Sequence, residues 1–93
     1  MMIAELRRLA KECLSIIQTS NIKDNEIELW IKMAIQDMQR LGIDVDNDKR
    51  KDLINGAIMM YVRANFGSTS IEEKELCQSS YNMHVAELQV SKE

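Results

Sequence analysis

The segment between residues 44 and 52 has the acidic spacing of a calcium-binding loop. Aspartates stand at the first, third, fifth and ninth positions of an EF-hand pattern, as Asp44, Asp46, Asp48 and Asp52. The match then fails, because Lys49 replaces the required glycine and Asn55 replaces the bidentate glutamate. The basic residues at 49–51 would also repel a cation. We therefore predict no metal site here and expect the aspartates to cap and solvate a loop.

Cysteine and histidine chemistry is limited to Cys13, Cys77 and His84. Two thiols and one imidazole fall short of the four ligands of a structural zinc site. The seven-residue spacing of Cys77 and His84 puts both on one helix face, where a nucleophile and its base would lie. However, no oxyanion donor is apparent nearby in the sequence. We predict no catalytic residue, no metal and no cofactor, with reduced thiols in a cytosolic protein and a packed or interface histidine.

Two basic clusters are the candidates for contact with phosphate groups. They are Arg7, Arg8 and Lys11, and Lys49, Arg50 and Lys51. The simpler interpretation of each is a solvated helix face or neutralisation by neighbouring aspartates. The chain has a net charge of −3, all of it contributed by residues 68–93, so one subunit alone would bind DNA poorly. A ring of subunits would multiply the basic residues around its centre.

Apolar residues recur at intervals of three and four along four stretches, which predicts four amphipathic helices. The expected ranges are about 2–18, 24–41, 49–66 and 71–89. Gly42 and Gly67 follow the second and third helices, where a chain often turns in the left-handed conformation. Expected caps at the helix starts are Asp24, Asp46 or Asp48, and a capping box made by Ser70 and Glu73.

The third and fourth helices carry more apolar surface than one helix face requires. The third is apolar nearly all round, so it is either the central helix or meets another subunit. The fourth has two stripes, Cys77, Tyr81, His84, Val85 and Leu88, and Leu76, Met83 and Val90. We expect Trp30 to pack in the core. The candidates for contacts between subunits are Met33, Met59, Met60, Leu76 and Met83.

Length and composition limit the architecture. Ninety-three residues with no proline and three glycines predict one all-α domain over 1–93, a small bundle of four helices with short loops. The start lacks the apolar core of a signal peptide. No apolar run approaches the roughly 20 residues of a membrane span, so we expect no membrane partner.

Three pieces of the sequence together match a family pattern. They are DNEIELWIKMAIQDMQRLGI, which ends in Gly-Ile, DLINGAIMMYVRANFG, and the Ser80-Tyr81 pair followed by AEL. Their order resembles that of the small head–tail connector (adaptor) proteins of long-tailed phages, also called phage DNA-packaging proteins. The characteristic A-I-x-x-Y-V-x-x-x-F-G helix end is matched by Ala57, Ile58, Tyr61, Val62, Phe66 and Gly67. The chain departs from the family in lacking a proline before Leu53 and in its short tail after Leu88.

The resemblance implies a non-enzymatic connector of a phage or prophage. Such proteins form a ring, commonly dodecameric, under the portal, and packaged DNA passes through it without being read. The implied partners are other copies of the chain, the portal protein, a neck or tail completion protein, and DNA. The implied location is the bacterial cytoplasm before assembly and then the virion neck. The alternatives are a helix-turn-helix DNA-binding regulator and an antitoxin-like adaptor module.

Overall fold

The computed structural model describes residues 3–16 and 18–90 of the chain. Four α-helices are present, α1 (Ile3–Cys13), α2 (Asp24–Arg40), α3 (Lys51–Asn65) and α4 (Ile71–Val90). A 3₁₀ turn, η1 (Asp48–Arg50), leads into α3. Strands are absent from these residues, so the all-α prediction is confirmed.

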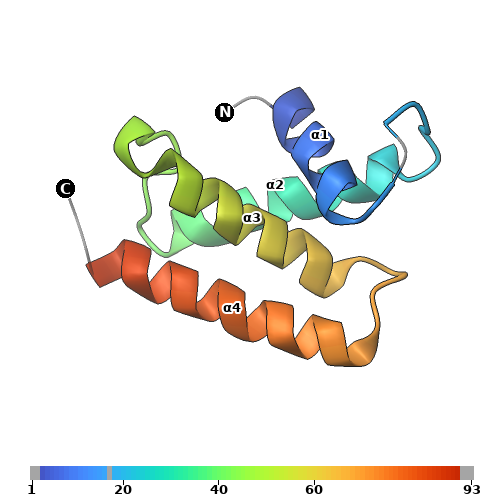
Figure 1. Cartoon of the computed structure of the whole chain (residues 1–93). Helices are drawn as coiled ribbons and strands as arrows, with labels where there is room; N and C mark the ends of the chain where they lie inside the picture. The colour runs from blue at the N-terminus through green and yellow to red at the C-terminus, as the bar shows by residue number, and fades with distance from the viewer. Residues whose placement is uncertain (1–2, 17, 91–93) are drawn as a thin grey trace.

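Helix α3 is the central helix of the bundle. It packs mainly against α4 and also against α2 and α1, and Figure 1 shows it antiparallel to α4. Its buried residues are Ile54, Ala57, Ile58, Val62 and Ala64. At Gly56, the imidazole Nε2 of His84 lies 3.6 Å from the place a Cβ would occupy, which is ordinary van der Waals distance. The nearly all-round apolar pattern of α3 is therefore explained by neighbours within the same chain.

Helices α1 and α2 end in the same hydrogen-bonded motif. After α2, Gly42 has φ of +83°, its N–H donates to Gln39, and the Ile43 N–H donates to Met38. After α1, Ser15 has φ of +59° and the Ile16 N–H donates to Lys11. Both are Schellman motifs, in which one left-handed residue reverses the chain. The Gly42 prediction is confirmed, whereas the end of α1 is set by a serine.

The first helix is shorter than its apolar pattern predicts. It ends at Cys13, and Leu14 and Ile16 pack against the core from the turn that follows. Residues 2 and 17 of the predicted range lie outside the described residues. The turn at Ser15 brings the following residues back over the core. Leu14 and Ile16 therefore continue the apolar spacing of α1 although they lie outside the helix.

Three predicted helix caps also differ from the structure. Asp24 is the first residue of α2, and its carboxylate faces Lys11 instead of capping the helix. Asn47 caps η1, so neither Asp46 nor Asp48 does. Gly67 lacks a left-handed φ, and its N–H instead donates to Glu26.

The start of α4 is as predicted, because the Ser70 hydroxyl accepts a hydrogen bond from the Glu73 N–H at 3.2 Å. The loop before α3 is less polar than its sequence indicates. Ile43 and Val45 are buried, while Asp44 and Asp46 alternate with them on the exposed side. The Asp44 carboxylate accepts from the Asp46 N–H, which tightens the turn. This loop therefore closes one end of the core.

The two matching helix ends give a paired prediction. Gly42→Ala should lower the free energy of unfolding by about 1 kcal/mol, because a Cβ is strained at positive φ. Ser15→Gly should raise it by up to about 1 kcal/mol by relieving the same strain. Urea unfolding monitored by circular dichroism measures both changes. Shifts of the same sign in the two variants would contradict the assignment of both ends to one motif.

Candidate functional site

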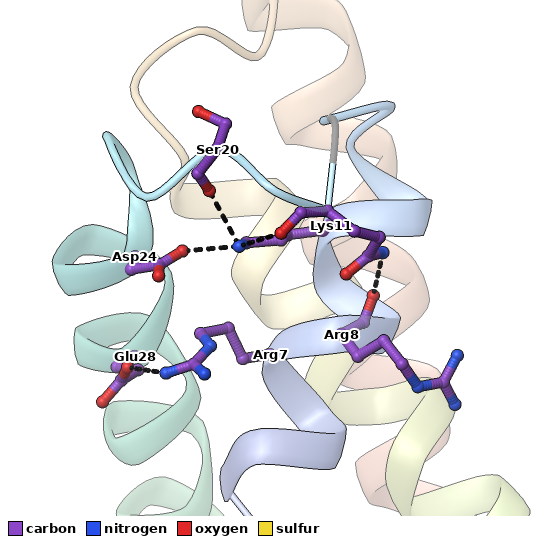
Figure 2. Close-up of polar contacts among 7 residues, drawn as sticks. Arg7, Arg8, Lys11, Ser20, Asp24 and Glu28 are labelled. Carbon is purple, nitrogen blue, oxygen red and sulfur yellow. Dashed lines mark hydrogen bonds and ion pairs between the residues drawn. The ribbon is translucent and has the colours of Figure 1, made fainter.

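The basic cluster on α1 is divided between the interior and the surface. Lys11 is 4% exposed, and its ammonium lies 2.8 Å from the Asp24 carboxylate. It also donates to the backbone carbonyls of Gln18 and Ser20 at 3.0 and 2.8 Å (Figure 2). Gln18 and Ser20 belong to the segment that joins α1 to α2, and Asp24 is the first residue of α2. Lys11 thus holds the connection between α1 and α2 in place. The prediction that Lys11 contacts DNA is wrong, because its side chain is buried.

The two arginines beside Lys11 remain closer to solvent. Arg7 pairs with Glu28 of α2 at 2.6 Å, and the hydrogen bond to Glu28 raises the pKa of the guanidinium. Arg8 pairs with Glu12 one turn along α1 at 2.9 Å, and its side chain is 52% exposed. Of the three basic residues of α1, Arg8 is therefore the most available to an external phosphate.

The second basic cluster divides in a similar way. Arg50 is half-buried and donates to the carbonyls of Glu87 and Leu88 at 3.4 and 3.3 Å. It thereby caps the C-terminal end of α4, where carbonyl groups lack helical partners. Lys49 and Lys51 are exposed, and no ion pair joins either to another residue in the described ranges. These two lysines are the freest cations of the cluster.

Cys77, His84 and the neighbouring acidic residues are the side chains that could offer metal or nucleophilic chemistry. Within residues 3–16 and 18–90, no three His, Cys, Asp or Glu side chains are grouped so that they could hold a metal ion. The Nδ1 of His84 lies 2.7 Å from the Ser80 carbonyl oxygen. Burial raises the pKa of the Cys77 thiol, and the nearby Arg63 offsets this only in part. A raised pKa disfavours the thiolate, which is the nucleophilic form.

A polar contact between α2 and α4 was not anticipated from the sequence. The Tyr81 hydroxyl donates to Asp37 at 2.6 Å, and Arg40 donates to the other carboxylate oxygen at 2.6 Å. Burial alone would raise the pKa of Asp37, but these two hydrogen bonds outweigh it, and the net pKa is lowered. The Tyr61 ring packs edge-on against Tyr81, with 5.0 Å between centroids. Residues 44 positions apart in the sequence meet here, so periodicity gave no signal for the pair.

The five candidates for contacts between subunits differ widely in exposure. Leu76 and Met83 of α4 are 71% and 72% exposed, and Met33 of α2 is 41% exposed. Met59 and Met60 are half-buried and pack against the core. The apolar surface available to a partner is therefore concentrated on the outer sides of α2 and α4.

The rival helix-turn-helix interpretation requires an exposed, basic recognition helix. The third helix would have to serve as this helix, but among the residues of α3 only Lys51 and Asp52 are exposed, because α1, α2 and α4 pack around it. A helix covered in this way cannot enter a major groove. None of the helices in the described ranges is both long and apolar enough to span a membrane.

Comparison with known protein families identifies a match over most of the chain. A family model described as "Phage connector protein" matches residues 8–93, which includes all of α2, α3 and α4. No curated protein and no solved structure matches the chain significantly.

The buried Lys11 pair gives a stability prediction. Lys11→Met should lower the free energy of unfolding by about 3 kcal/mol, because it leaves the Asp24 carboxylate without its cation. Arg8→Met removes an exposed pair on the same helix and should change it by less than about 1 kcal/mol. Urea unfolding of both variants tests this. Equal effects would contradict the structural role of Lys11.

The lowered pKa of Asp37 gives a pH prediction. The pKa of Asp37 is lower in the folded chain than the ordinary value of 3.8. Its ionised form therefore stabilises the fold at pH values above 3.8, and this stabilisation is lost as the pH falls through the folded-state pKa. Tyr81→Phe removes a hydrogen bond to the charged form, so the pKa of Asp37 should rise. Tyr61→Phe is the control and should leave that pKa close to the wild-type value. NMR titration of the Asp37 carboxyl carbon measures both, and an unchanged pKa in Tyr81→Phe would contradict the assignment.

Proposed function

Because the chain belongs to the phage connector protein family, matched over residues 8–93, we propose that it is the ring-forming head–tail connector of the phage or prophage that encodes it. The family is structural and in general non-enzymatic. In the proposed role the ring docks beneath the portal, continues its channel, and presents a platform to the next neck or tail protein. The family match over almost the whole chain is the observation that carries this proposal.

The distribution of apolar surface supports assembly into a ring. A ring requires two different surfaces on each subunit, because each copy meets its neighbour head to tail. The subunit has exposed large apolar side chains on both α2 and α4, among them Leu29, Met33, Leu76 and Met83. The core is already closed around α3, so these side chains are left for partners. Contacts with the portal and the next neck protein would use further surfaces of the ring.

In this role, contact with DNA is electrostatic and independent of sequence. We assign it first to Lys49, Lys51 and Arg8, whose side chains are exposed. Arg7 and Arg50 contribute less, because each is engaged within the subunit. A net charge of −3 per subunit would keep binding weak outside the ring, which suits a channel through which DNA must move.

Deletion of the gene from its phage tests the proposal. We expect DNA-filled heads and unattached tails to accumulate, with infectivity restored when the wild-type chain is supplied from a plasmid. Electron microscopy of the lysate and plaque counts measure the two outcomes. A plasmid with an early stop codon in the same gene is the matched control. Normal yields of tailed, infectious particles from the deletion phage would contradict the connector role.

A further inference from the structure

The outer side of α4 carries a regular seam of exposed residues. They are Leu76, Ser79, Met83, Ala86 and Val90, all exposed and spaced alternately by three and four. The core-facing residues of α4, such as Tyr81 and Leu88, lie on its opposite side. Large side chains at one position of the repeat and small ones at the other form the pattern by which one helix packs closely on a second helix. In Figure 1 the side of α4 away from α3 is uncovered.

The charges beside this seam limit what can pack on it. Glu72, Glu75 and Glu87 of α4 are exposed, and α4 as a whole contains four glutamates and one lysine. Two copies of α4 placed side by side would bring these carboxylates together, which is unfavourable. The chemistry of the seam therefore fits a helix that has exposed apolar side chains and basic neighbours.

Helix α2 presents such a face on the same subunit. Leu29 and Met33 are 52% and 41% exposed, and Lys32, Gln36 and Arg40 surround them on the surface. Arg40 remains 70% exposed at its side chain although it pairs with Asp37. The apolar and basic character of this face matches the apolar and acidic character of the α4 seam.

The α2 face is basic because the four carboxylates of this helix bind partners within the subunit. All four are partly buried and have partners within the subunit. The pairs are Asp24 with Lys11, Glu26 with the Gly67 N–H, Glu28 with Arg7, and Asp37 with Tyr81. Within α2, which the structure describes in full, the exposed charged residues are both cations. A helix with a net negative sequence thus has a positive outer face.

We propose that the α4 seam of one subunit packs on the α2 face of the next copy of this chain. Leu76 and Met83 meet Leu29 and Met33, and the glutamates beside the seam meet Lys32 and Arg40. The exposed stretches are about 21 Å long on α4 and about 17 Å on α2, so they differ by less than one helical turn. The two surfaces differ, so the contact is head to tail and can close a ring. This pairing rests on the proposed ring and names the surfaces that build it.

Two variants that each disable one surface test the pairing. Met83→Asp places a charge in the α4 seam and leaves the α2 face intact, whereas Leu29→Asp does the reverse. Each alone should weaken self-association roughly 30-fold or more, as loss of a central interface contact does. An equimolar mixture should form a one-to-one heterodimer that grows no further, because one good surface remains on each partner. Sedimentation velocity measures the species formed.

Ile22→Asp is the matched control, because Ile22 is 87% exposed and lies outside both surfaces. It should associate like the wild type, and circular dichroism should show unchanged helicity in all three variants. A wild type that stays monomeric up to about 1 mM would overturn the pairing. So would a mixture that remains monomeric, or a Leu29→Asp chain that still dimerises through α4 alone. Those results would leave the connector role standing if the deletion phage still lacks tailed particles.

Discussion

Burial of α3 is the constraint on which the rest of the structure depends. This helix is apolar on most of its circumference, and residues such as Ile54, Ile58 and Val62 are at most 1% exposed. In the part of the chain that the structure describes, α1, α2 and α4 each turn one face to α3 and leave the other face outside. The large apolar residues Leu29 and Met33 of α2, and Leu76, Met83 and Val90 of α4, are thus left exposed.

The polar contacts hold the outer helices in place around α3 and also determine the surface charge. Glu26 accepts from the Gly67 N–H and from Trp30 Nε1, which ties the start of α2 to the loop between α3 and α4. Arg50 ties the start of α3 to the end of α4. Because such ties use the carboxylates of α2, its outer face is left with Lys32 and Arg40. The contacts that hold α2 in place in the subunit therefore also leave its outer face positively charged at the proposed interface.

The fold could be predicted because helical periodicity and the glycine after α2, Gly42, are local signals. Helix number follows from them, whereas for α3 they allow either a central place or contact with another subunit, and the structure shows the central place. The sequence-based predictions were wrong where tertiary contacts determine the conformation or burial of a residue. Ser15 adopts a conformation usually taken by glycine, Ile43 and Val45 are buried from a loop rich in aspartate, and Lys11 is buried by a partner 13 positions away. The charge pattern of the sequence does not distinguish the buried Lys11 from exposed lysines such as Lys49 and Lys51.

A cryo-electron microscopy reconstruction of the virion neck tests the central claim most directly. We expect a closed ring of this helical subunit between portal and tail. In that ring α4 of each copy should contact α2 of its neighbour, and Lys49 and Lys51 should face the channel. A neck without this chain, or a ring whose copies meet through other surfaces, would contradict the connector role in the first case and the proposed interface in the second.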